Sequence, residues 1–402
     1  MEQNPFPHYL SCDPAAAFVS NHKMYNEFED LGIVELATEE DNPSSSIRIL
    51  QITDLHMFPR ECRAFEGIPL LDSYDECIQL IATLVEVTKP DVIILTGDII
   101  DGRGPWNSSD RVTETVQHIV VHFRGIPWAF LPGNHDDDHS PWTRAELTRI
   151  FQLQGCLQRK ARGFHHTVLL TKRSRSSLDN KDSSRDVTRV RLHMFDSGGN
   201  HPNEKIMYYC TPAKAIDGFT RAVQKQAASA HDNDEADVTG LVYIHIPTPE
   251  YQGLDPVVGK NRLFEAAVMA GKLPPPLDKL VWLIKLLKKD RIAGCTRGQD
   301  TGLFSALVHA NDHYNAGIAS VFCGHDHHSD AVFYRRGIFL AYGRSGSLTP
   351  PYDWEGKAPN PLQPGARIAE VSSDGVLKTW IQTAIGAEHD SFLDMVSYHK
   401  NG

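Results

Sequence analysis

The chain has 402 residues, of which 41% are hydrophobic and 23% are charged, and these proportions are those of an ordinary globular protein. Its formal net charge of −11 argues against general nucleic-acid binding and against attraction to an anionic membrane surface. The seven cysteines include no CxxC pair, so neither a zinc knuckle nor a disulfide framework is indicated.

The N-terminal residues "MEQNPFPHYLSCD" have no basic region followed by an apolar stretch, which a secretion signal would need. The sequence also contains no apolar run long enough to cross a bilayer as a helix. We therefore expect a cytoplasmic protein without a membrane span.

The first elements alternate between strand and helix. We read residues 1–46 as an irregular, acidic N-terminal extension before the main domain. From Ile47 the apolar pattern predicts, in order, the strand "IRILQIT", the helix "LDSYDECIQLIATLVEVT", the strand "PDVIILTGD", a helix over residues 109–124 and the strand "IPWAFLPGN". This order favours parallel strands joined by helical crossovers.

The second half of the chain predicts further strands. These are "HHTVLLTKR", "VTRVRLHMFD", "GLVYIHIPTPE" and the apolar run that ends at Cys323, with a helix over residues 211–230 and a helical insert at 253–293. The short strands in "AVFYRRGIFLAYG", "ARIAEVS" and "GVLKTWI" indicate a second, mixed sheet. We place the main domain at 47–383 and a C-terminal tail at 384–402.

Polar clusters follow five of the apolar strands, in the segments "TDLH", "TGDIID", "GNHD", "VYIHIP" and "GHDHH". Taken singly, each cluster is compatible with a turn or with a hydrogen-bonded histidine. The carboxyl ends of parallel strands meet at one edge of a sheet, which is where such sheets bind ligands. Seven donors could therefore converge: Asp54, His56, Asp98, Asn134, His245, His325 and His327.

The chemistry of these donors indicates metal. Imidazole, carboxylate and amide oxygen without thiolate suit Mn²⁺, Fe or Zn²⁺. Residues two apart on an extended backbone face the same way, so Asp54 with His56, and His325 with His327, are natural chelating pairs. Seven donors exceed the needs of one tetrahedral ion but suit two divalent ions that share a carboxylate.

The ordered series "DLH", "GDIID", "GNHD", "YIHIP" and "GHDH" resembles the calcineurin-like metallophosphoesterase superfamily over residues 47 to about 381. The segment "VYIHIPTPEY", with "LHMFDSG" before it, resembles the branch of purple-acid-phosphatase-29-like and fungal phosphatases. The resemblance implies a four-layer α/β/β/α fold, with two mixed β-sheets face to face between helices. It assigns Asp54, His56 and His327 to one metal, and Asn134, His245 and His325 to the other, with Asp98 as the bridge.

The sequence departs from true purple acid phosphatases at two positions. His56 stands where they have glycine, and Asp101 stands where they have a tyrosine ligand. Without that tyrosine we expect no purple iron(III) centre. The resemblance also suggests His135 as the proton donor or charge stabiliser, oriented by Asp101.

Other polar residues near the motifs receive weaker assignments. Arg344 is a candidate for binding substrate phosphate, with a surface arginine as the alternative. We read residues 136–139 as a solvated turn. Asp326 and His328 are expected beside the metal ligands or in solvent rather than on a metal.

The leading hypothesis is a dinuclear metallophosphoesterase that hydrolyses phosphate monoesters, either phosphoproteins or small esters, by attack of a metal-bound hydroxide. One alternative is a phosphodiesterase acting on cyclic nucleotides, lipid head groups or nucleic acid. A third hypothesis is a non-catalytic scaffold, which predicts lost ligands, whereas all seven positions carry donors.

Overall fold

The computed structural model describes most of the chain. The described residues are 27–37, 45–65, 68–70, 73–159, 161–174, 187–203, 207–229, 238–252, 254–259, 300–348 and 362–394. Residues 260–293, which make up most of the predicted helical insert, lie outside this set.

One sheet has six strands, in the order β15-β14-β13-β2-β5-β6. Its parallel half consists of β2 (Ile47–Ile52), β5 (Val92–Thr96) and β6 (Trp128–Leu131), which the helices α2 (Ser73–Thr88) and α3 (Ser109–Val120) connect. Its antiparallel half consists of β13 (Gly365–Val371), β14 (Leu377–Thr383) and β15 (Ala387–Asp394). Every residue of β5 is buried, which explains its continuous apolar sequence.

The other sheet has seven strands, in the order β1-β7-β8-β9-β10-β12-β11. Strands β8 (Val187–Met194), β9 (Thr239–Tyr243), β10 (Ile318–Cys323) and β12 (Ile338–Tyr342) are successive parallel neighbours. The remaining strands are β1 (Glu29–Leu36), β7 (His166–Arg173) and β11 (Val332–Arg335). A short hairpin of β3 (Ala64–Phe65) and β4 (Ile68–Pro69) stands apart.

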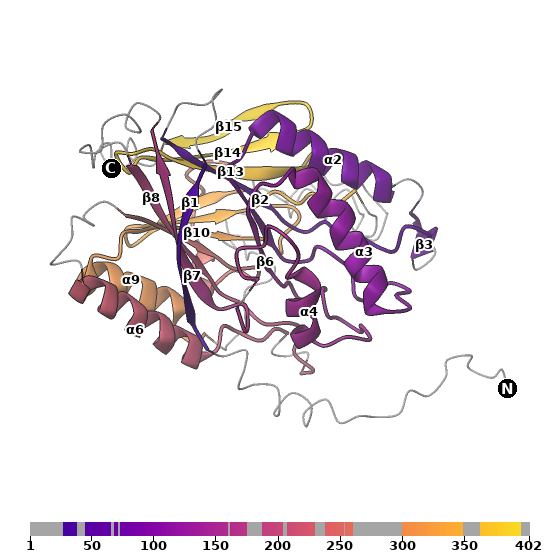
Figure 1. The fold of residues 1–402 in the computed structure, drawn as a ribbon, viewed down its shortest axis with the longest axis horizontal. Coiled ribbons are helices and arrows are strands. Elements are labelled where there is room, and N and C mark those ends of the chain that lie inside the picture. The colour runs from indigo at the N-terminus through magenta and orange to yellow at the C-terminus, as the bar shows by residue number, and fades with distance from the viewer. Residues whose placement is uncertain are drawn as a thin grey trace, which may run out of the picture.

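Helices cover the outer faces of the two sheets. The helices α6 (Ala213–Ser229) and α9 (Leu303–Tyr314) lie on one side of the pair, and α2, α3 and α4 (Arg144–Phe151) lie on the other (Figure 1). Neighbouring residues of β9 alternate between two apolar clusters: Leu241 packs in the cluster shared by both sheets, and Val242 packs beneath α6 and α9. This arrangement confirms the predicted four-layer α/β/β/α fold.

The structure differs from the predicted pattern at both ends of the chain. Strand β1 lies within residues 1–46 and pairs in parallel with β7, so this segment is not irregular throughout. Strand β15 lies beyond residue 383 and pairs with β14. Both are edge strands with exposed residues such as Ile33 and Phe392, so their hydrophobic signal is weak. None of the described helices is long and apolar enough to span a bilayer.

Candidate metal centre

The seven predicted donors follow strands of both sheets. Asp54 and His56 come after β2, Asp98 after β5, Asn134 after β6, His245 after β9, and His325 and His327 after β10. Within each sheet these strands are parallel, so their carboxyl ends share an edge. The Gln51 side chain joins the two edges, because it donates a hydrogen bond of 3.0 Å from β2 to the carbonyl of Cys323 in β10.

The first group contains Asp54, His56 and His327. One potential ligand atom from each lies within 4.8 Å of the others. The His56 and His327 Nε2 atoms are 3.0 Å apart, and the His327 Nε2 atom lies 3.4 Å from the Asp54 Oδ1 atom. Asp54 and His56 are at most 1% exposed, so their polar atoms are shielded from solvent.

The second group contains Asp98, His245 and His325, again with ligand atoms within 4.8 Å of one another. The His245 Nε2 atom lies 3.1 Å from the Asp98 Oδ2 atom and 3.2 Å from the Asn134 Oδ1 atom. The same Asp98 Oδ2 atom lies 3.6 Å from the His56 Nε2 atom of the first group. Asp98 therefore stands between the two groups.

These spacings fit metal coordination. Metal–nitrogen bonds of about 2.0–2.1 Å place neighbouring ligand atoms about 3.0–3.4 Å apart. Asp54 and Asp98 are both 1% exposed, and two buried carboxylates this close need positive charge nearby. Imidazole and carboxylate donors in two adjoining groups match the preferences of two divalent cations of the Mn, Fe or Zn type.

Electrostatics at the site point the same way. Burial lowers the pKa of His325 to about 3 and that of His56 to about 4, so both imidazoles are neutral, the form that binds metal. Burial opposes protonation of His245, but the carboxylates of Asp98 and Asp54 raise its pKa to about 9. The same negative potential would attract a metal cation.

Four of the seven donors have a left-handed backbone, with φ of 53° at Asp54, 47° at His56, 51° at Asp98 and 76° at His325. Each such residue costs about 1–3 kcal/mol, and strained residues of this kind cluster at functional sites. The argument that Asp54 and His56, or His325 and His327, form chelating pairs on an extended backbone is therefore wrong, and His325 and His327 lie in different donor groups. The Asp54 and His56 side chains converge because the chain turns sharply after β2.

Asp136 anchors two of these turns, and its assignment to a solvated turn is wrong. It is fully buried, and its carboxylate accepts hydrogen bonds from the backbone N–H groups of Asp98, Ile99, Ile100 and Gly133, at 2.6–3.1 Å. Burial and the Asp98 charge raise the pKa of Asp136 to about 7, and the backbone donors oppose this rise. The carboxylate ties the loop after β5 to the loop after β6.

His135 is oriented by a different carboxylate from the predicted one. Its Nδ1 atom lies 3.2 Å from the Asp138 Oδ2 atom. Burial would lower the pKa of His135, but the Asp98 and Asp138 carboxylates raise it. Asp101 instead receives two hydrogen bonds from the Arg103 guanidinium and lies 3.5 Å from the His56 Nδ1 atom.

Arg344 does not lie at the surface, and its guanidinium is already neutralised. The residue is 1% exposed, and its guanidinium pairs with the carboxylates of Asp330 and Glu388. Its predicted role in binding substrate phosphate is therefore not supported by its position. Asp326 and His328 are buried in the loop after β10, where the Asp326 carboxylate accepts a hydrogen bond from the His328 N–H.

The loop after β8 also reaches the site, a contact that we did not predict from the sequence. The Asn134 amide donates a hydrogen bond of 3.3 Å to the Asn200 Oδ1 atom, and the Tyr208 ring meets the His325 ring edge-on with centroids 4.8 Å apart. A backbone bridge joins Asn200 to Tyr208. Since β8 is parallel to β9, its carboxyl end lies at the same edge, and the segment "SGGNH" was the available signal.

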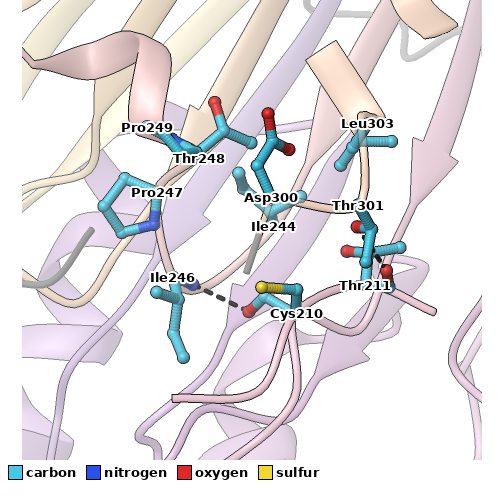
Figure 2. Close-up of a pocket in the computed structure, with 11 residues that line it drawn as sticks. Cys210, Thr211, Ile244, Ile246, Pro247, Thr248, Pro249, Asp300, Thr301 and Leu303 are labelled. Atoms are coloured by element: carbon cyan, nitrogen blue, oxygen red, sulfur yellow. Dashed lines mark hydrogen bonds between the residues drawn. The ribbon is translucent and has the colours of Figure 1, made fainter. Parts of the chain in front are cut away.

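A small pocket lies beside the centre, between the loops after β8 and β9 and the start of α9 (Figure 2). Ile244 and Ile246, the neighbours of His245, line it together with Cys210, Thr211 and Thr301. None of the seven predicted metal ligands lines this pocket, so it is separate from the metal centre.

Two face-to-face sheets carry two histidine- and carboxylate-rich donor groups at their shared edge, an arrangement typical of metal-dependent hydrolases. Residues 47–264, more than half of the chain, match the family model of the calcineurin-like phosphoesterases. The chain belongs to this family and is a phosphoric ester hydrolase, as the sequence motifs predict.

Several known proteins are similar to the chain. "Probable inactive purple acid phosphatase 29" from Arabidopsis thaliana is 23% identical over 318 residues, which cover 75% of this chain and 72% of that protein. Phosphatase DCR2 from Saccharomyces cerevisiae is 24% identical over 54% of this chain, and the match spans only 37% of the yeast protein. The cyclic AMP phosphodiesterase CpdA of Escherichia coli is 33% identical over 22% of this chain and 30% of its own length.

Among solved structures, a dimetal phosphatase from Danio rerio has a similar fold, with a TM-score of 0.50 at 9% identity. The likeness covers 87% of this chain and 99% of that structure. At this identity the comparison supports the fold alone.

Proposed function

We propose that the chain hydrolyses phosphate monoesters, on phosphoproteins or on small molecules, at a centre of two divalent Mn, Fe or Zn ions. The observation that carries the proposal is the pair of largely buried donor groups that meet at Asp98. Two such ions would supply Lewis acidity and lower the pKa of a bound water.

We assign the ligands by the groups that the fold brings together. Asp54, His56 and His327 would hold one ion, and Asn134, His245 and His325 the other, with Asp98 shared between them. Only two carboxylates belong to this set, so two divalent cations would leave a positive surplus. That surplus supports binding of an anionic phosphate at the edge of the sheets.

His135 is the proposed proton donor to the leaving group. Its side chain is 22% exposed, compared with 11% for the proposed ligand His327, so it borders the space that a substrate would enter. The Asp98 and Asp138 carboxylates favour its protonated form. Asp138 would hold the ring through Nδ1 and leave Nε2 to face the substrate.

Phosphodiester hydrolysis is the second candidate, because one of the similar proteins is a cyclic AMP phosphodiesterase. That match covers 22% of this chain, whereas the match to the Arabidopsis protein named as a phosphatase covers 75%. The longer match supports the monoester.

A paired assay separates the two candidate activities. Purified protein would be loaded with Mn²⁺, Fe²⁺ or Zn²⁺ and given 4-nitrophenyl phosphate and bis(4-nitrophenyl) phosphate, with Asp98→Asn as the site-defective control. We expect turnover of the monoester that exceeds turnover of the diester and that Asp98→Asn abolishes. Preference for the diester would favour the second candidate, and no turnover of either ester with any metal would contradict the proposal.

A further inference from the structure

Arg144, the first residue of α4, joins two loops at the metal centre. Its guanidinium makes hydrogen-bond contacts with six acceptor oxygens, which its five N–H groups share, and its side chain is only 15% exposed. A capping box between Thr143 and Glu146 fixes the start of α4 and so the direction in which the Arg144 side chain leaves the helix.

On one side, Arg144 binds the loop after β6. It donates to the backbone carbonyls of Pro132 and Gly133 at 3.1 and 3.0 Å, and to the Asp137 carboxylate at 2.7 Å. These residues surround the predicted ligand Asn134. The backbone directly before Asn134 is therefore held by the guanidinium.

On the other side, Arg144 binds the loop after β8. It pairs with both carboxylate oxygens of Asp196, at 2.8 and 2.7 Å, and donates to the carbonyl of Gly198 at 3.0 Å. Asp196 also accepts the Gly198 N–H at 2.7 Å. Burial would raise the pKa of Asp196, but the Arg144 charge and its hydrogen bonds hold it below the usual value.

The two clamped loops meet at a pair of amides. Asn200 lies two residues after Gly198, and its Oδ1 atom accepts a hydrogen bond from the Asn134 amide, while its own amide donates to the Asn134 carbonyl, both at 3.3 Å. This pairing uses the Asn134 nitrogen, so the Asn134 Oδ1 atom is turned towards His245, 3.2 Å from its Nε2 atom. An oxygen in that place is the donor that a metal ion requires.

We propose that the Arg144–Asp196 ion pair is a positioning device for one of the two metal positions, the one that uses Asn134. By holding the loops after β6 and β8 together, the ion pair keeps Asn200 hydrogen-bonded to Asn134. The inference rests on the proposed dinuclear centre. The position formed by Asp54, His56 and His327 receives none of the six Arg144 hydrogen-bond contacts, so the effect is selective.

The chain offers a matched control for a role in folding alone. Lys172 in β7 and Asp91, just before β5, form another largely buried ion pair between the two sheets, with an N–O distance of 2.6 Å. Lys172 pairs in register with Thr188 near the start of β8, and Asp91 precedes Val92, so this pair lies at the opposite ends of the strands from the metal centre. Asp91 is 12% exposed and Asp196 is 7% exposed, so the two carboxylates are comparably buried.

The test compares Asp196→Asn with Asp91→Asn. The full chain would be stripped of metal with a chelator, desalted and titrated with Mn²⁺ by calorimetry, and its melting temperature would be recorded. We expect both variants to melt at a lower temperature than the wild type. Only Asp196→Asn should weaken one Mn²⁺ site, by about 10- to 100-fold, while the other site keeps its affinity.

Three further variants make the result specific. Arg144→Lys, which keeps the charge but loses the forked geometry, should weaken the same site to a smaller degree. Asn200→Ala should weaken that site while the ion pair stays intact. In the double variant Asp196→Asn with Asn134→Ala, the losses should be less than additive, because both changes act on the same ligand.

Several outcomes would overturn the inference. These are an equal loss at both Mn²⁺ sites in Asp196→Asn, no loss at either site, the same selective loss in Asp91→Asn, or additive losses in the double variant. A wild type that binds fewer than two Mn²⁺ ions would overturn both this inference and the dinuclear proposal. A wild type that binds two ions but hydrolyses no phosphoester would overturn only the proposed function.

Discussion

Replacing Asp136 with asparagine should destabilise the loops that carry the predicted metal ligands Asp98 and Asn134. Its Oδ1 atom accepts the N–H groups of Ile99 and Ile100, and its Oδ2 atom accepts those of Asp98 and Gly133. Asparagine keeps one oxygen of similar shape, but its NH₂ group faces two N–H donors. Two hydrogen bonds to a charged acceptor are lost, and two buried backbone N–H groups face the asparagine NH₂ group, which cannot accept a hydrogen bond from them.

The expected loss follows from the number of bonds. Hydrogen bonds to charged groups contribute about 1.5–3 kcal/mol each, so two of them amount to about 3–6 kcal/mol of unfolding free energy. The total stability of a protein is about 5–15 kcal/mol, so the variant should still fold at low temperature. Asp98, with φ of 51°, depends on this anchor, and its carboxylate should become less well placed between the two donor groups.

Urea unfolding at pH 8 would measure the loss, and elemental analysis after Mn²⁺ loading would measure metal content. Asp300→Asn is the control, because the Asp300 carboxylate is exposed and accepts the Gly302 N–H at the surface. The control should change the unfolding free energy by less than about 1 kcal/mol. If Asp136→Asn loses as little as the control and still binds two ions, Asp136 is not the anchor of these loops.

Two further predictions concern histidines. His135→Ala should keep both metal ions and lower kcat by roughly 10²- to 10⁴-fold, with a smaller loss for esters that have a nitrophenolate leaving group. Asp138→Asn should show the same leaving-group dependence in milder form. Loss of metal in His135→Ala, or an equal effect on all leaving groups, would contradict the assignment of His135 as the proton donor. His193, whose two ring nitrogens have no hydrogen-bond partner among the described residues, has its pKa lowered to about 3 by burial, with smaller contributions from Arg191 and His166. The folded state therefore takes up the proton less readily than the unfolded state, and stability should fall as the pH drops below about 6.5, by about 2 kcal/mol at pH 5 for this residue. His193→Leu should flatten the loss between pH 7 and pH 5 in urea titrations by that amount, and an unchanged pH profile would contradict the prediction.

The sequence was sufficient to predict the strands whose two faces are both buried. Strand β5 is apolar throughout because sheet and helix cover both of its faces, and its end is marked by "TGD". The same logic located β2, β6, β9 and β10 and brought their terminal donors to one edge. Parallel pairing then predicted that these residues meet, without any knowledge of distances.

The errors have a common physical cause, which is long-range pairing of polar groups. "DDD" at 136–138 has the composition of a solvated turn, yet Asp136 is buried because backbone donors from the loop after β5 surround it. In the sequence Arg344 resembles a surface arginine, but in the structure it is neutralised by an ion pair with Glu388 of β15. The residues next to Arg144 and Asp196 in the sequence do not predict their ion pair, because the two residues are 52 positions apart in the chain.

The placement of the donors also affects the order of events as the chain is made. Each donor group takes its last member from the segment after β10, His327 for the first group and His325 for the second. The ribosome must therefore extend the chain as far as His325 before either full group exists, and strand β13, which flanks β2, is made later still. Metal cannot nucleate early folding through these complete groups. Metal binding by a full donor group could stabilise the fold only after β10 has been made, so the strands before β10 must associate through their apolar contacts.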